Sequence, residues 1–123
     1  MNYDPHIIIS LFHLLLVVPF FLYVGLQKSA VSDYVYTVLL VLGVIITLYH
    51  GYKSYTRWVN SSPYLWVNLI HTVLVGPLLI YIGAKGKDTP RAYYEMLLLL
   101  AFGAGGYHLY SIVEQMNNVR VDH

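Results

Sequence analysis

Cysteine is absent from this chain of 123 residues, and charged side chains are scarce, at 11% of the sequence. Without cysteine the protein has no disulfide, no thiolate metal site and no cysteine nucleophile. The formal net charge is only +1, and the lysines and arginines are scattered along the chain. Because no basic tract is present, we expect no nucleic-acid partner.

The sequence also lacks the motifs of common enzyme classes. It has no P-loop, no G-x-S-x-G, no H-E-x-x-H and none of the repeated His-x-x-His clusters of membrane desaturases. Carboxylates paired at a catalytic spacing are missing too. If the protein is an enzyme, it is therefore expected to be a component of a membrane oxidoreductase, although no residue requires that chemistry.

Hydrophobic residues make up 58% of the chain, and they form four runs close to the roughly 20 residues needed to cross a bilayer. The runs cover residues 6–26, 34–55, 64–84 and 92–112. The first run exceeds a signal-peptide core and has no cationic segment before it, so we expect it to be retained as a helix. The sequence predicts an all-α, multi-pass integral membrane protein with a single transmembrane domain over residues 1–123.

Short connections follow the runs, at residues 27–33, 56–63 and 84–91, so sequential helices should be antiparallel neighbours in an up-down four-helix bundle. Pro5, Pro63 and Pro90 lie where helices are expected to begin. Both termini and the central connection then share one side, called side A here. The lysines and arginines are divided almost evenly between the two sides, so the positive-inside rule leaves the orientation open.

An internal repeat relates the two halves of the chain. Residues 2–52 align without a gap to residues 60–110, with 16 identities over 51 positions. The informative matches are His13 with His71, Pro19 with Pro77, Gly25 with Gly83, Tyr49 with Tyr107 and His50 with His108. Such matches are far less expected in an apolar composition than leucine or valine matches. We therefore expect two tandem helical hairpins, residues 2–57 and 60–115, related by a pseudo-twofold axis along the membrane normal.

Apart from His6 at the start of the first run, one histidine falls in each predicted helix. These four histidines lie at one depth, about seven residues or roughly 10 Å from side A. Small and polar residues share their helix faces. These residues are Ser10, Gly43, Thr47, Ser54, Arg57, Asn68, Ala101, Ala104, Gly105, Ser111 and Gln115. We expect this stripe to face the bundle interior, with Pro19 and Pro77 bending their helices just beyond it.

A layer of four imidazoles predicts a bound group, because ionisable residues inside a membrane are usually functional. The predicted cofactor and metal ligands are His13, His50, His71 and His108. Their predicted neighbours are Ser10, Asn68, Tyr49 and Tyr107, and Ser10 and Asn68 should orient the imidazoles of their own helices. His6 and His123 are expected to be interfacial or tail residues.

Haem b is the favoured group, because the porphyrin dianion neutralises the metal and two imidazoles can bind axially within a helix bundle. A bare Cu, Fe or Zn ion also accepts imidazole, but no carboxylate is level with the histidines to compensate its charge. A chlorin bound through Mg is a further alternative. One layer near side A indicates electron transfer on that side, with a quinone or a soluble redox carrier as partner.

Two other classes of function fit the same residues. Imidazole titrates near neutrality, so a histidine ring below a vestibule of Ser54, Arg57, Ser111 and Gln115 can gate a proton or ion channel. Past the histidine layer, the first helix is apolar and offers no evident polar path for ions, which weakens the channel alternative. In a structural or assembly protein the histidines would only join helices, at about 0.6 kcal/mol per bond. Small residues on the fourth helix would also allow a homo-oligomer.

Overall fold

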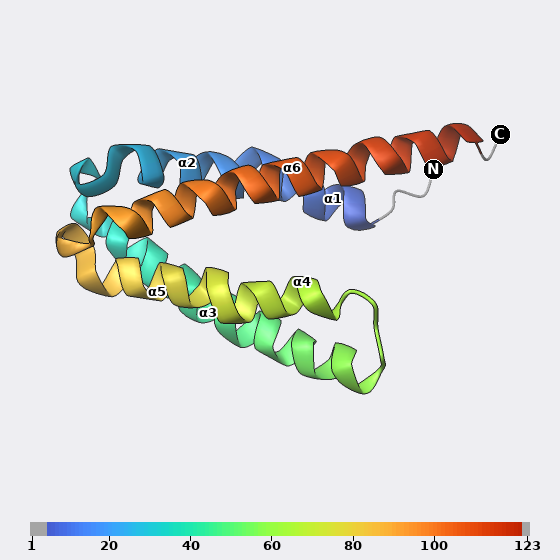
Figure 1. Cartoon of the computed structure of the whole chain (residues 1–123), viewed down its shortest axis with the longest axis horizontal. Helices are drawn as coiled ribbons and strands as arrows, with labels where there is room; N and C mark the ends of the chain where they lie inside the picture. The colour runs from blue at the N-terminus through green and yellow to red at the C-terminus, as the bar shows by residue number, and fades with distance from the viewer. Residues whose placement is uncertain (1–4, 122–123) are drawn as a thin grey trace. The chain divides into compact units, whose positions relative to one another are not determined.

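The computed structural model of the chain describes the backbone of residues 5–121 and the side chains of residues 7–117 (Figure 1). Every element in this part of the chain is helical. The first helix contains α1 (Pro5–Phe12), the π-helical turn η1 (His13–Val17) and α2 (Val18–Gln27), and the 3-10 turn η2 (Lys28–Ala30) follows it. The second helix is α3 (Asp33–Val59). The third contains α4 (Leu65–Ile70), the π-helical turn η3 (His71–Val75) and α5 (Gly76–Lys85), followed by η4 (Gly86–Asp88), and the fourth is α6 (Arg91–Val121).

Four helices in the described chain are long and apolar enough to cross a membrane, which confirms the four predicted runs. They are Ile7–Ala30, Asp33–Val59, Leu65–Asp88 and Arg91–Asn117. The helices extend past the predicted ends, most clearly in α6, which continues beyond Ile112. The residues there include good helix formers such as glutamate and glutamine, which propagate a helix without any need for lipid.

The chain divides into two compact units, and each is described by itself. The middle unit contains residues 27–94, with α3, α4, η3 and α5. The terminal unit contains residues 1–26 and 95–123, with α1, η1, α2 and most of α6. Each unit thus combines one helix from each predicted repeat. This grouping leaves the prediction of two tandem hairpins untested.

In the middle unit, α3 runs antiparallel to the helix formed by α4, η3 and α5 (Figure 1). The backbones approach closely at two glycines. A Cβ atom at Gly83 would lie 2.6 Å from the amide nitrogen of Leu40, and one at Gly43 would lie 2.8 Å from that of Ile80. Glycine therefore sets the spacing of this helix pair, as small residues commonly do between membrane helices.

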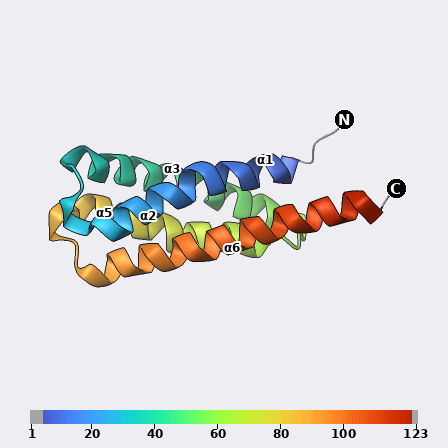
Figure 2. The ribbon, with the colours of Figure 1, turned by 90° about the horizontal axis from the view of Figure 1, so that it is seen from above.

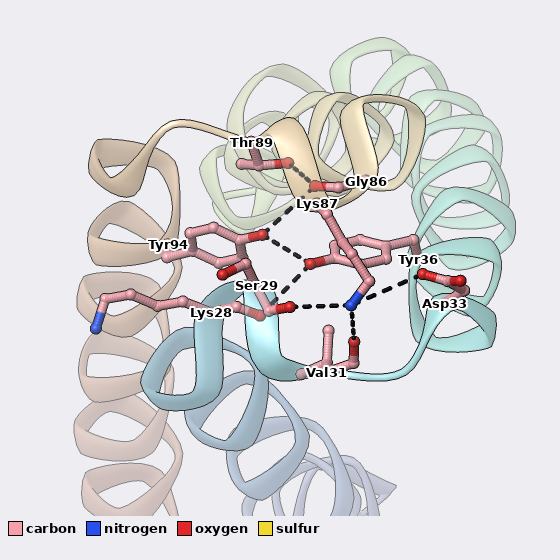
Figure 3. Close-up of polar contacts among 9 residues, drawn as sticks. All are labelled: Lys28, Ser29, Val31, Asp33, Tyr36, Gly86, Lys87, Thr89 and Tyr94. Atoms are coloured by element: carbon pink, nitrogen blue, oxygen red, sulfur yellow. Dashed lines mark hydrogen bonds and ion pairs between the residues drawn. The ribbon is translucent and has the colours of Figure 1, made fainter.

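Lys87 joins the two turns of the middle unit (Figure 3). Its Nζ donates hydrogen bonds to the carbonyl oxygens of Ser29 and Val31, both at 3.0 Å, and lies 3.8 Å from a carboxylate oxygen of Asp33. A charged donor to carbonyls forms a stronger hydrogen bond than a neutral one. The turn after α2 is thereby tied to η4.

Two buried tyrosines lie beside this contact (Figure 3). The hydroxyl groups of Tyr36 and Tyr94 form a hydrogen bond of 2.9 Å. Each hydroxyl also lies 3.5 Å from a turn carbonyl, that of Lys28 for Tyr36 and that of Gly86 for Tyr94. The buried phenol groups therefore have hydrogen-bond partners, as buried polar groups need.

A π-helical turn precedes each proline that lies within a helix. Pro19 and Pro77 have no amide hydrogen, and in a regular α-helix their rings would clash with the carbonyl four residues back. In each π turn, the amide just before the proline bonds to the carbonyl of a histidine five residues back, His13 in η1 and His71 in η3. The widened turns therefore begin at histidines, and such turns are frequent at functional sites.

In the terminal unit, α6 packs beside the helix formed by α1, η1 and α2 (Figure 2). A Cβ atom at Gly105 would lie 3.7 Å from Val18, an ordinary contact distance. The helices are therefore less tightly apposed at Gly105 than at Gly83. Ser10 and His108 meet across the pair and are both buried, so part of the predicted polar stripe faces a partner helix here.

Candidate functional site: two imidazole pairs

The four predicted histidines form two stacked pairs, one in each unit. In the middle unit, the ring centroids of His50 on α3 and His71 in η3 are 4.2 Å apart, with 18° between the ring planes. In the terminal unit, the rings of His13 in η1 and His108 on α6 stack at 4.3 Å and 20°. Within each unit the structure thus brings together two histidines that the sequence places at equal depth.

His13 and His71 are oriented by their own helices. Nδ1 of His71 lies 2.7 Å from the carbonyl oxygen of Val67, and Nδ1 of His13 lies 2.8 Å from that of Ile9. Because a carbonyl oxygen only accepts, Nδ1 carries the hydrogen in both rings, and Nε2 of the neutral imidazole holds the lone pair. Histidines that bind a metal through Nε2 commonly have this arrangement.

His50 is oriented from the partner helix by Asn68. The amide Nδ2 of Asn68 lies 2.8 Å from Nδ1 of His50, and Nη1 of Arg57 donates to Oδ1 of Asn68 at 2.6 Å. Arg57 also donates to the carbonyl of Tyr64 at 3.3 Å, and its guanidinium lies 5.8 Å from the centre of the Tyr64 ring. Asn68 is only 3% exposed, so both ends of its amide are used in an enclosed position.

His108 is oriented from the partner helix by Ser10. Nδ1 of His108 lies 3.1 Å from Oγ of Ser10. A hydroxyl group can donate or accept, so this contact is compatible with either tautomer of the ring. One turn beyond Ser111 on α6, Nε2 of Gln115 lies 3.5 Å from the Ser111 hydroxyl. Within the part of the chain that the structure describes, Oε1 of Gln115 is buried without a hydrogen-bond partner.

Several contacts recur in the two units at positions 58 residues apart. In each unit, one histidine bonds to the backbone carbonyl four residues before it in its own helix. A polar side chain three residues before that histidine bonds to the other histidine of the unit, which lies on the partner helix. A tyrosine lies edge-on to the following histidine, at 5.1 Å for Tyr49 and 5.2 Å for Tyr107. The bonding residues are Ser10, His13 and His108 in the terminal unit and Asn68, His71 and His50 in the middle unit.

The predicted neighbours do contact imidazoles, but in a different pattern. Ser10 and Asn68 bond to the histidines of the partner helices, whereas the sequence predicts that they orient the imidazoles of their own helices. A side chain three residues before a histidine lies on the same helix face and reaches across the pair, while the histidine itself folds back on a carbonyl of its own helix. Of His6 only the backbone is described, and His123 lies outside the described residues.

Stacking limits how each pair can bind a metal. Both rings of a pair cannot bind one ion, because a ligand nitrogen binds in its own ring plane at about 2.0–2.1 Å and the stacked rings face each other instead. Among the described side chains, no group of three His, Asp or Glu residues is placed to hold a metal ion. Ligation by all four histidines together therefore stays a prediction from the sequence.

An open apolar groove of about 320 Å³ lies in the middle unit. Its α3 residues follow His50 in the sequence, as Arg57 does. It is lined by Ser54, Tyr55, Trp58, Leu65 and Leu69. Ser54, expected in a polar vestibule, donates its hydroxyl hydrogen to the carbonyl of His50 at 2.7 Å. That hydroxyl is therefore occupied by the backbone of its own helix.

The contact of Arg57 with Asn68 is the functional detail that sequence reasoning misses. The sequence places Arg57 on the face of His50, but not against a residue of the next helix. A usable signal exists: two polar residues, Arg57 and Asn68, lie at similar distances on either side of the connection between α3 and α4, residues 60–64. An antiparallel hairpin brings such residues level.

Comparisons with known proteins identify no relative: no protein family, curated protein or solved structure matches the chain.

Proposed function

We propose that the protein is a multi-pass integral membrane protein. The four apolar helices support this proposal, and so do the large apolar side chains on their outer surfaces. Ile8, Leu15, Leu48, Val73 and Leu99 are between 62% and 71% exposed, and lipid would cover them. Such exposure of many large apolar side chains is expected where lipid covers a protein.

The chain is further proposed to be a duplicated hairpin with a pseudo-twofold axis along the membrane normal. The sequence repeat and the contacts that recur 58 residues apart support this arrangement. The bond between Tyr36 and Tyr94 joins a residue to its own repeat equivalent, which is the type of contact that a twofold axis generates.

The imidazole pairs are proposed to hold a prosthetic group, haem b before any other, in an electron-transfer role on side A. The observation that carries this proposal is the bond from Nδ1 of His13 and His71 to a backbone carbonyl. That bond fixes the tautomer in which Nε2 is the ligand atom and makes the nitrogen more basic. In the middle unit His71 would supply an axial nitrogen with His50 stacked against it, and in the terminal unit His13 would do so with His108 stacked against it.

Haem suits these residues better than a bare ion does. A divalent Cu, Fe or Zn ion on neutral imidazoles keeps its charge, and burying such a charge costs several kcal/mol. A porphyrin or chlorin brings its own dianion and needs one axial nitrogen from a given unit, which a stacked pair can supply. When bound, haem would supply one-electron chemistry toward a quinone or soluble carrier.

Visible absorbance of the purified protein tests this proposal. Protein expressed with a haem supply is expected to show a Soret band, and His13→Ala and His71→Ala should each weaken or remove it. His123→Ala is the matched control and should keep the band. Circular dichroism checks that the variants remain helical. A Soret band of wild-type intensity in both His13→Ala and His71→Ala would exclude these ligands.

Proton or ion conduction is the second candidate, because each stacked pair places a ring with a lone pair on Nε2 beside another imidazole. Elemental analysis of a colourless sample would detect a bare metal. Proton flux in liposomes would then separate conduction from a structural or assembly role, which predicts no flux.

A further inference from the structure

Arg57 is held in a fixed position relative to Asn68. Its Nη1 donates at 2.6 Å to Oδ1 of Asn68 and at 3.3 Å to the carbonyl of Tyr64, and its charge lies over the Tyr64 ring. A guanidinium has only hydrogen-bond donors. The amide of Asn68 must therefore turn its oxygen toward Arg57, because the reversed amide would place two donors against each other.

The orientation of this amide decides the tautomer of His50. With its oxygen on Arg57, Asn68 presents its NH₂ group to Nδ1 of His50, 2.8 Å away. An amide NH₂ only donates, so Nδ1 of His50 accepts, and the hydrogen of the neutral ring resides on Nε2. We propose that Arg57 is a positioning residue that, through Asn68, holds His50 as the Nε2–H tautomer.

The stacked partner of His50 has the opposite tautomer. Nδ1 of His71 donates to the carbonyl of Val67 at 2.7 Å, which leaves the lone pair on Nε2. The middle unit thus contains one imidazole with a ligand-type Nε2 and one with a donor-type Nε2. For His50 to bind a metal through Nε2, its hydrogen would have to move to Nδ1 and the bond from Asn68 would break.

The terminal unit differs at the two positions that matter. Gln115 occupies the repeat equivalent of Arg57, and Ser10 that of Asn68. The Ser10 hydroxyl can donate to Nδ1 of His108 or accept from it, and Nε2 of Gln115 donates to the Ser111 hydroxyl of its own helix at 3.5 Å. The donor chain that selects the tautomer of His50 is therefore not repeated by the contacts of Ser10 and Gln115.

The tautomers of His50 and His71 assign metal ligation in the middle unit to His71 and hydrogen-bond donation to His50. This assignment of the ligand is the one part of the inference that rests on the proposed function. The tautomers are assigned from the contacts of Arg57, Asn68 and Val67.

Long-range ¹H–¹⁵N NMR of the full chain with ¹⁵N-labelled histidine, in nanodiscs, reads the tautomer of each ring. In the wild type, His50 should carry its hydrogen on Nε2 and His71 on Nδ1. Arg57→Gln should raise the Nδ1–H population of His50 about fivefold, the effect of one net hydrogen bond on an equilibrium constant. Arg57→Lys keeps a purely donating cation and should restore the wild-type signal. His71 is the internal control and should not change.

The reciprocal transplant tests the same idea in the terminal unit. The double variant Ser10→Asn with Gln115→Arg should give His108 a single Nε2–H tautomer. Wild-type His50 with its hydrogen on Nδ1, or Arg57→Gln with an unchanged His50 signal, would overturn the proposal. A colourless protein with the expected tautomers would contradict haem binding but not the role of Arg57. A coloured protein in which His50 has the opposite tautomer would contradict the role of Arg57 but not haem binding.

Discussion

Asn68 connects a charged side chain to an imidazole inside the helix pair. Its amide accepts from Arg57 and donates to His50, and the side chain is almost completely buried. Ser10, at the equivalent place in the terminal unit, makes a single contact of 3.1 Å with His108. The two residues therefore carry unequal shares of the polar contacts around the imidazoles.

Replacing Asn68 should consequently cost more stability than replacing Ser10. Asn68→Ala removes the amide partner of both a cation and a ring nitrogen, and we expect a loss of about 1–3 kcal/mol, the cost of unsatisfied buried groups. Ser10→Ala removes one contact and should cost about 0.6 kcal/mol, the average for such bonds between membrane helices. Unfolding of both variants by denaturing detergent checks the order, and equal losses would contradict it.

At the scale of side chains, the sequence predicts which residues gather but not how they bond. His13, His50, His71 and His108 are recognisable because each is an ionisable residue within a largely apolar helix and all four lie at one predicted depth. Ser10 and Asn68 follow from helical spacing. Which nitrogen of an imidazole is engaged, and by which helix, depends on rotamers and on the rotation of each helix, and the spacing of residues leaves both open.

At the scale of helices, close backbone contact and π-helical turns shape the middle unit. Gly83 of α5 lies against the backbone of α3, where a Cβ atom would be 2.6 Å from Leu40 N and 2.7 Å from Tyr36 O. Gly51 lies on α3, and there a Cβ atom would meet only Thr72 Cγ2, at 3.8 Å. These two glycines provide a matched comparison.

Alanine at Gly83 should separate the helices, whereas alanine at Gly51 should be accommodated. Gly83→Ala forces backbone atoms apart and is expected to cost about 1–3 kcal/mol through overpacking. Gly51→Ala meets ordinary contact and should gain up to about 1 kcal/mol from helix propensity. Detergent unfolding measures both changes, and a Gly83→Ala variant as stable as the wild type would show that the helix contact is not as close as described.

The apolar runs predict the helices well, because length and hydropathy decide where a chain can cross a membrane. The π-helical turns η1 and η3 are less accessible to prediction. Pro19 and Pro77 indicate a disturbance, but proline inside a helix produces kinks as well as π turns. The choice depends on the backbone bonds around His13 and His71, which the sequence pattern does not contain.

At the scale of the whole molecule, the repeat is the property that the sequence reveals best. It predicts that equivalent residues have equivalent surroundings, and the contacts of His13 and His71 are indeed alike. It does not reveal where the copies have diverged chemically. Arg57 and Gln115 are both long and polar, and the contacts of Arg57 with Asn68 and Tyr64 become visible only in the structure.

The central claim is that an imidazole of this protein binds the iron of a haem through Nε2. Resonance Raman spectroscopy of the reduced protein reads the iron–imidazole stretching band directly. Protein grown with ¹⁵N-labelled histidine should show that band at a lower frequency, and the band should weaken in His71→Ala and His13→Ala. A porphyrin spectrum whose iron–ligand band is insensitive to histidine labelling, or no porphyrin spectrum at all, would contradict the claim.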